Sequence, residues 1–175
     1  MAPKNSRAQA WADMYEACKA PSMSDSSTEA VIQRCLEIGA NVNWYTQEEK
    51  DTALHAASAC GSRHIVQVLL EKGALTEKAN ADGVTPLHVA SRDGHVNIMR
   101  LLLAKGAVVD SENKWDGTPL HDACEYGHPD AVKVLLDQGA DIEKEDGYKK
   151  TPLLYACEEG DTNCGGPPGL WRCSD

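Results

Sequence analysis

Four related tetrapeptides at a constant spacing decide how this chain folds. They read Thr52-Ala53-Leu54-His55, Thr85-Pro86-Leu87-His88, Thr118-Pro119-Leu120-His121 and Thr151-Pro152-Leu153-Leu154. Each begins 33 residues after the one before it. A constant period between about 20 and 50 residues is typical of proteins built from stacked copies of one small unit. The sequence therefore predicts a repeat array, and function is expected at the positions that differ between copies.

Residues 82–107 show what one copy contains. After an Asp-Gly turn signal, Thr and Pro are favoured at the start of a helix, which we expect over Pro86–Arg92. The Asp93-Gly94-His95 stretch breaks the chain. Apolar residues at steps of three and four then predict a second helix over Val96–Ala104, which Gly106 ends. Each copy is thus expected to be a helix-turn-helix unit.

This pattern resembles the ankyrin repeat, in which a β-turn finger precedes two antiparallel helices. The connectors Gly94-His95 and Gly127-His128 also match, whereas Gly61-Ser62 departs from the family pattern. The resemblance covers about residues 11–160 and implies an all-α solenoid of stacked helix-turn-helix units with β-turn fingers. It also implies that the tetrapeptide histidine hydrogen-bonds the Thr of its own motif and neighbouring backbone.

The repeat register divides the chain into parts. We expect a disordered N-terminus at 1–10, a degenerate opening unit at about 11–43, units at 44–76, 77–109 and 110–142, a partial last unit at 143–160, and an irregular Gly/Pro tail at 161–175. In the opening unit, helices are predicted over 11–19 and 29–38, with a protruding loop at 20–28. Because a repeat array needs its last apolar layer covered, Leu170 and Trp171 are expected to fold back over that layer.

The acidic balance limits the classes of partner. The net charge is −10 and the pI is about 5.0, which argues against binding to nucleic acid or to an anionic membrane surface. It is compatible with a protein partner that carries a basic or mixed-charge surface. No apolar run reaches the roughly 18 residues of a membrane span, and residues 1–10 lack the apolar core of a secretory signal. The cysteines are odd in number and lack paired spacing, which indicates a reducing compartment. A cytoplasmic protein is expected, with the nucleus as the alternative.

No group of residues predicts catalysis, a metal site or a cofactor. Five of the six histidines belong to the tetrapeptides or the connectors, and none has metal-ligand spacing. Cys124 and Cys157 lie in a column of small residues, whereas Cys60 and the tail cysteines are the thiols expected to be reactive. The carboxylates of the first helices, Asp122 among them, are interpreted as solvated acids. We therefore predict a non-enzymatic protein without cofactor or metal.

The positions free to vary lie on the fingers and on the exposed side of the first helices. In the family that this chain resembles, these positions line a concave face to which partners bind. Five of the nine aromatic residues fall there. The predicted partner-binding residues are Trp44, Tyr45, Arg92, Lys114, Trp115, Glu125, Tyr126, Tyr148 and Lys149. Because Trp115, Tyr126 and Tyr148 come from adjacent units, they are expected to cluster, with Arg92 beside them.

The finger turns are expected to differ between units. Gly83 in one finger is matched by Lys50, Asp116 and Lys149 in the others, so one turn geometry is not anticipated for all four.

The favoured function is that of a module that binds another protein. The chain is expected to be a monomer, and the alternative is weak association through its uncapped C-terminal end. Two other interpretations remain open. The runs 118–124 and 151–158 look like those of ankyrin-repeat proteins with a suppressor-of-cytokine-signalling box, which would make the chain a substrate-recognition fragment of a ubiquitin-ligase adaptor without its box. The array could also be an engineered or recombined scaffold.

Overall fold

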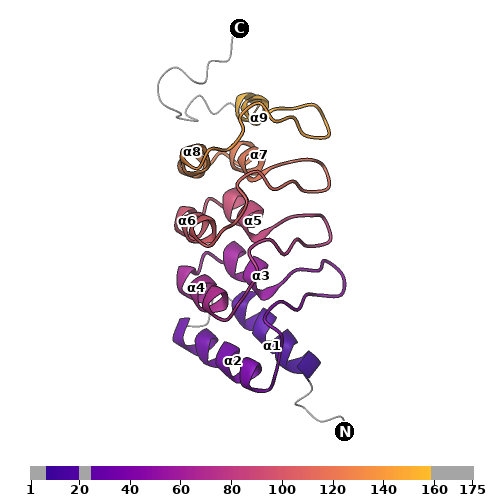
Figure 1. The fold of residues 1–175 in the computed structure, drawn as a ribbon, viewed down its shortest axis with the longest axis vertical. Coiled ribbons are helices and arrows are strands. Elements are labelled where there is room, and N and C mark those ends of the chain that lie inside the picture. The colour runs from indigo at the N-terminus through magenta and orange to yellow at the C-terminus, as the bar shows by residue number, and fades with distance from the viewer. Residues whose placement is uncertain (1–6, 20–24, 159–175) are drawn as a thin grey trace.

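The fold is a stack of helix pairs with loops projecting to one side (Figure 1). The computed structural model describes residues 7–19 and 25–158. Within these ranges the helices are α1 (Arg7–Lys19), α2 (Asp25–Glu37), α3 (Ala53–Ala59), α4 (Arg63–Glu71), α5 (Pro86–Arg92), α6 (Val96–Ala104), α7 (Pro119–Glu125), α8 (Pro129–Asp137) and α9 (Pro152–Glu158). The predicted all-α repeat fold is confirmed, and α5 and α6 have the bounds that the sequence predicts.

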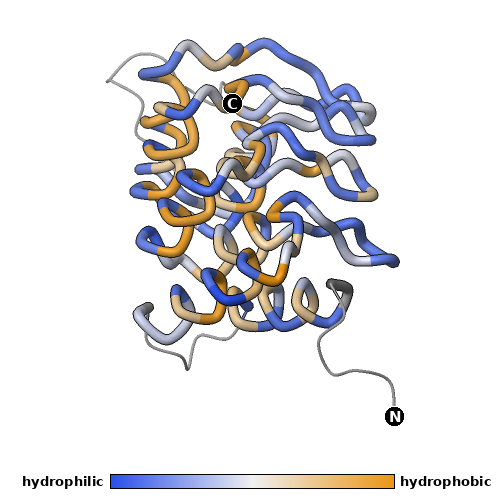
Figure 2. Tube along the Cα trace, turned by 60° about the horizontal axis from the view of Figure 1, so that its bottom comes forward, coloured by the Kyte–Doolittle hydropathy of each residue, from blue (hydrophilic) through white to orange (hydrophobic). Residues whose placement is uncertain are grey.

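Two layers of helices run along the stack. Helices α1, α3, α5, α7 and α9 contact one another in order and form the layer nearer the fingers, whereas α2, α4, α6 and α8 form the outer layer (Figure 1). We call α3, α5, α7 and α9 the first helices of their units. Apolar residues gather on the helices and polar residues on the fingers (Figure 2). The core therefore continues from unit to unit and has no single centre.

The core repeats with the same period as the sequence. Leu54, Leu87 and Leu120 of the first helices are at most 1% exposed, and their side chains fill equivalent places in successive layers. Leu102 and Leu135 do the same in the outer helices and are fully buried. Small residues at one first-helix position, such as Ser91 and Cys124, are also buried, which allows neighbouring helices to approach closely.

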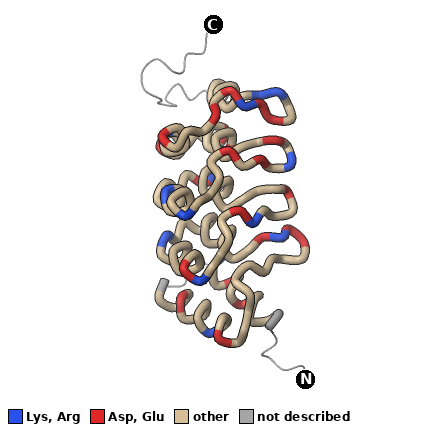
Figure 3. Tube along the Cα trace, viewed as in Figure 1, with Lys and Arg blue, Asp and Glu red and all other residues tan. Residues whose placement is uncertain are grey.

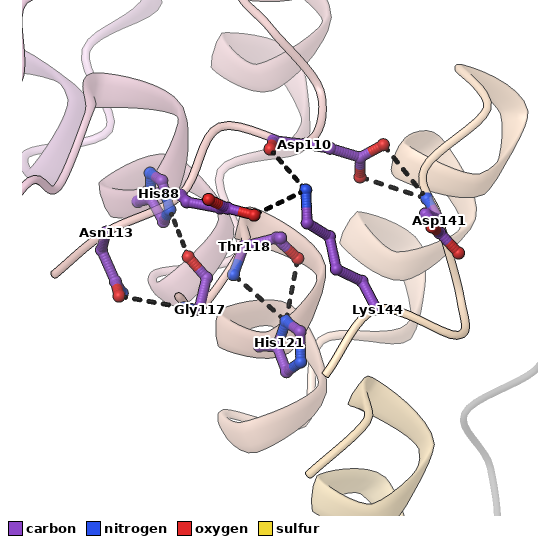
Figure 4. Close-up of polar contacts among 9 residues, drawn as sticks. His88, Asp110, Asn113, Gly117, Thr118, His121, Asp141 and Lys144 are labelled. Carbon is purple, nitrogen blue, oxygen red and sulfur yellow. Dashed lines mark hydrogen bonds and ion pairs between the residues drawn. The ribbon is translucent and has the colours of Figure 1, made fainter. Parts of the chain in front are cut away.

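The tetrapeptide histidines join each unit to the next. The Nδ1 atom of His88 accepts a hydrogen bond from the Thr85 backbone N–H at 3.2 Å. The His88 Nε2–H donates to the Gly117 carbonyl of the next finger at 3.1 Å (Figure 4). His55 and His121 make the same pair of contacts, with Val84 and Lys150 as the carbonyl partners. Both ring nitrogens of the neutral imidazole are thus satisfied, as the resemblance implies for these residues.

The connector histidines point the other way along the stack. His95 donates from Nε2 to the Ala59 carbonyl at 3.0 Å, and His128 donates to the Arg92 carbonyl at 2.8 Å. A Cβ atom on Gly94, whose φ is +68°, would lie 2.7 Å from the His128 ring. Glycine is therefore required at this position both by its backbone conformation and by the ring packed against it.

Three of the fingers share one turn, contrary to the expectation of different conformations. Asn80, Asn113 and Asp146 each accept two backbone N–H bonds through a side-chain oxygen, and each donates its own N–H to the carbonyl four residues on. Asp116 and Lys149 adopt φ values of 58° and 62°, the left-handed conformation that Gly83 adopts at 77°. The Asn or Asp side chain fixes this turn, so glycine is not needed for it.

This turn predicts a stabilising substitution. Lys149→Gly is expected to raise the free energy of unfolding by about 0.5–1 kcal/mol, because it removes the strain of a side chain at positive φ and adds a smaller entropy cost. Lys133→Gly, in the exposed middle of α8, is the matched control and should lower the stability by about 1 kcal/mol. Urea unfolding of both variants measures the difference, and a destabilised Lys149→Gly would show that this turn carries no strain.

The opening unit is more helical than predicted. Helix α1 begins at Arg7, so residues 7–10 are not part of a disordered N-terminus, and Ala10 is buried in the core. Helix α2 begins at Asp25, so the last part of the predicted 20–28 loop is helical, with Thr28 only 4% exposed. Packing of α1 against α2 and α3 explains both extensions, since a polar sequence alone gives no sign of such contacts. The predicted cover by Leu170 and Trp171 lies outside the described residues.

Candidate functional site

A cleft of about 250 Å³ lies among two neighbouring fingers and the first helices α5, α7 and α9. We call these fingers the third, which carries Trp115, and the fourth, which carries Tyr148. Five residues predicted to bind a partner line it: Arg92, Trp115, Glu125, Tyr126 and Tyr148. The predicted clustering of aromatic residues from adjacent units, with Arg92 beside them, is therefore seen in the structure. The cleft also contains residues that the sequence did not single out for binding, notably His121, Asp122, Asp146 and Tyr155.

The aromatic residues of the cleft are presented by rigid local structure. The Asn113 side chain accepts a hydrogen bond from the Trp115 N–H at 2.9 Å. Tyr126 is the C-cap residue of α7, and its N–H is bonded to carbonyls of that helix. The Gly147 N–H donates to the Trp115 carbonyl at 2.7 Å and holds the third and fourth fingers side by side. Trp115, Tyr126 and Tyr148 are 48%, 54% and 68% exposed, so each has a large apolar surface in contact with solvent.

The remaining predicted residues lie elsewhere. Trp44 is half-buried and stacks on Trp11 with ring centroids 5.8 Å apart, so it packs against the opening helix and does not stand free on the face. Tyr45 is 38% exposed, and the Lys78 Nζ atom lies 5.1 Å from its ring centroid. The prediction that Trp44 is exposed on the binding face is therefore wrong, because the Trp11 ring of α1 packs against it.

The two predicted lysines point along the fingers. Lys114 pairs with Asp82 of the preceding finger at 3.4 Å, and Lys149 pairs with Glu145 of its own finger at 3.5 Å. Acidic and basic residues are interspersed along the fingers in this way (Figure 3). Neither lysine lines the cleft. Exposed pairs of this kind contribute little to stability.

Asp122 is the residue that the sequence interpretation misplaced. It is partly buried on the wall of the cleft, and burial raises the pKa of its carboxyl to about 7, helped by Glu125 and Asp93 and opposed by Arg92. The signal was available in the repeat alignment. The equivalent positions of the other units hold the uncharged residues Ala56, Val89 and Tyr155. Ala56 and Val89 are only 7% and 6% exposed, so Asp122 is a carboxylate in a column of largely buried, uncharged side chains and not a solvated acid.

Asp146 shows how a carboxylate in the same cleft can be fully accommodated. It accepts the Tyr155 hydroxyl at 2.7 Å and the backbone N–H groups of Tyr148 and Lys150 at 2.9 Å each. Burial would raise the pKa of this carboxyl, yet these bonds stabilise its charged form and the net pKa lies below the usual value. Asp146 is thus a structural anion that shapes the fourth finger.

In residues 7–19 and 25–158, no three His, Cys, Asp or Glu side chains are placed to hold a metal ion. Burial raises the pKa of Cys18 to about 12 and that of Cys60 above its usual value, and the Cys60 thiol donates to the Lys19 carbonyl. Cys60 is therefore not the reactive thiol that its sequence position suggested. Cys157 is disulfide-bonded, contrary to the free small side chain expected there.

Comparison with known proteins places these observations in a family. No curated protein matches the chain significantly. None of the helices in the described ranges is long and apolar enough to cross a membrane. The family sequence model for ankyrin repeats in three copies matches residues 17–113 and 106–165. Ankyrin repeats are generally protein–protein interaction modules, and proteins built from them are typically not enzymes. With its helix pairs, histidine contacts and finger turns also in place, the chain belongs to the ankyrin-repeat family.

Proposed function

We propose that this chain binds a protein partner through the cleft between the third and fourth fingers. The observation that carries the proposal is the exposure of three large aromatic side chains that line one cleft, those of Trp115, Tyr126 and Tyr148. Exposed Trp and Tyr are frequent among the residues that dominate interface energies. None of the three sits in the apolar columns that hold the stack together.

The size of the cleft favours a protein segment over a metabolite. Pockets for drug-sized ligands usually enclose about 300–1,000 Å³ and bury most of the ligand. The cleft here has about 250 Å³ and is partly open to solvent. It therefore suits one or two side chains of a larger partner, whose remaining contacts extend over the fingers to Lys114 and Lys149.

Site-specific photo-crosslinking tests this assignment. A photoreactive phenylalanine in place of Tyr126, which is 54% exposed, is expected to form a cross-link with a protein of the host lysate. The control replaces Val108, an equally accessible residue at 51% exposure that lies beyond the end of α6 and away from the cleft. Equal cross-linking from both positions, or cross-linking from the Val108 position alone, would contradict binding through the cleft.

A further inference from the structure

The charge left unpaired in the cleft is negative. Arg92, the base among its lining residues, already contacts Asp93 with Nε and Oδ1 3.3 Å apart. Asp146 already accepts three hydrogen bonds from protein groups. Among the described residues, no group donates a hydrogen bond or forms an ion pair to the carboxylates of Asp122 and Glu125. A ligand would therefore meet two carboxylates that no described protein group hydrogen-bonds or pairs with, one exposed (Glu125) and one partly buried (Asp122).

Asp122 is costly to the free protein. A partly buried carboxylate without a hydrogen-bond donor is unfavourable, and a raised pKa is the sign of that cost. The apolar residues in the same column of the other units show that the stack does not need a carboxylate here. A group that lowers stability and shows a perturbed pKa in a cleft is typical of a binding site.

The walls of the cleft suit a planar cation. Trp115, Tyr126 and Tyr148 offer aromatic rings, whose faces attract cations. A guanidinium group is more weakly hydrated than an ammonium, stacks on aromatic rings and can donate two parallel hydrogen bonds to a carboxylate. An anion is disfavoured, because the neighbouring Asp93 already offsets the Arg92 charge.

We propose that the cleft binds an arginine side chain of the partner, with Asp122 and Glu125 as its anionic contacts and the aromatic residues as its walls. This inference rests on the proposed function and specifies what the partner presents. The acidic net charge of the chain, −10, acts in the same direction by attracting a basic segment.

Short peptides test the proposal without knowledge of the partner. The probes are acetylated and amidated Gly-Gly-Arg-Gly-Gly, the same peptide with citrulline in place of Arg, and the same peptide with Lys. Titration into ¹⁵N-labelled protein, followed by NMR, should show millimolar binding of the Arg peptide with shifts around Trp115 and Tyr126. We expect the citrulline peptide, which keeps the shape but lacks the charge, to bind at least about tenfold more weakly, and the Lys peptide to fall between them.

Two variants separate Asp122 from general electrostatics. Asp122→Asn is expected to weaken binding of the Arg peptide at least about fivefold at pH 8. Asp137→Asn removes the same charge from an exposed position at the end of α8 and should change the affinity less than about twofold. Retained amide spectra of both variants show that they are folded.

The affinity should also depend on pH. With a pKa near 7, the Asp122 carboxyl is mostly protonated at pH 6 and mostly ionised at pH 8, so the Arg peptide should bind more tightly at pH 8. The pH dependence should disappear in Asp122→Asn. The variant is the control for the other charged and titratable groups that face this carboxyl, because they are unchanged in it: Arg92, Asp93, Glu125, Asp146, His88, His121 and Tyr155.

The outcomes are distinct from those of the cross-linking experiment. Equal binding of the Arg and citrulline peptides, no detectable binding of the Arg peptide, or an Arg affinity unaffected by Asp122→Asn would overturn the arginine proposal. If cross-links still formed from the Tyr126 position, the cleft would remain the partner site with a different ligand side chain. Absence of those cross-links would instead contradict the proposed function, whatever the peptides did.

Discussion

Replacing His88 with alanine is expected to lower the free energy of unfolding by about 3–5 kcal/mol at pH 7. The imidazole is fully buried and joins Thr85 to the Gly117 carbonyl of the next finger. Its removal leaves a buried N–H and a buried carbonyl without partners and creates a cavity between two units. Urea unfolding followed by circular dichroism measures the loss.

His64 provides the control for this experiment. Its side chain is 48% exposed, and its Nε2 atom forms an exposed hydrogen bond with the Glu29 carboxylate at 2.9 Å. Exposed contacts between such side chains contribute at most about 1 kcal/mol, so His64→Ala should lower the free energy of unfolding by less than about 1 kcal/mol. A loss below about 1 kcal/mol for His88→Ala would show that the histidine contacts do not couple the units.

The second large effect is a gain in stability. Asp122→Asn is expected to raise the free energy of unfolding by about 2–4 kcal/mol at pH 8, because the folded protein must ionise a carboxyl whose pKa is raised from 3.8 to about 7. The folded state binds the proton more tightly than the unfolded state does. The cost is therefore fully present above pH 7, shrinks as the pH falls, and is absent below about pH 4.

Unfolding at several pH values tests the sign of this effect. The advantage of Asp122→Asn over the native chain should disappear near pH 4, whereas Asp137→Asn should stay close to the native chain throughout. A destabilised Asp122→Asn at pH 8 would show that the carboxylate is a structural acceptor. Combined with the peptide titration, the expected result is a variant that is more stable and binds arginine less well.

In the Asp122→Asn variant, the pH dependence of stability should also report the titration of the buried histidines. Burial lowers the pKa of His88 to about 4, so protons bind more tightly to the unfolded chain between that value and 6.5. Stability should therefore fall by about 3 kcal/mol for His88 alone as the pH decreases through this window. In the native chain, the opposite contribution of Asp122 offsets much of this loss.

Local signals explain why so much of the fold could be predicted from the sequence. The bounds of α5 and α6 follow from Thr85, the Gly94-His95 connector and Gly106, each of which acts on its own few residues. The 33-residue period then transfers the same interpretation to the other units. The opening helices lack these signals, and their bounds were correspondingly less well predicted.

Long-range contacts explain what the sequence could not provide for the site. The cluster of Trp115, Tyr126 and Tyr148 was predictable, because equivalent positions in adjacent units are neighbours in a stack. Trp44 was not, because its stacking partner Trp11 comes from a different kind of unit. The burial of Asp122 required comparison of one column across all copies, in which a charge among apolar residues marks an exception.

These observations connect the stability of the array to its proposed binding function. Buried histidines and leucines hold the units in register, and that register fixes the distance between the fingers that present Trp115 and Tyr148. Asp122 opposes stability within the same frame. The expected benefit of such a residue is recognition, in agreement with the trade-off between stability and function seen at binding sites.

The affinity for the cross-linked partner, once purified, tests the role of the cleft most directly. Isothermal titration should give a dissociation constant roughly 100-fold or more higher for the double variant Trp115→Ala, Tyr148→Ala than for the native chain. The control double variant Leu75→Ala, Val108→Ala removes apolar residues of similar exposure, 56% and 51%, outside the cleft and should bind within about twofold of the native chain. Equal loss in both double variants, or no loss in the first, would contradict partner binding through the cleft.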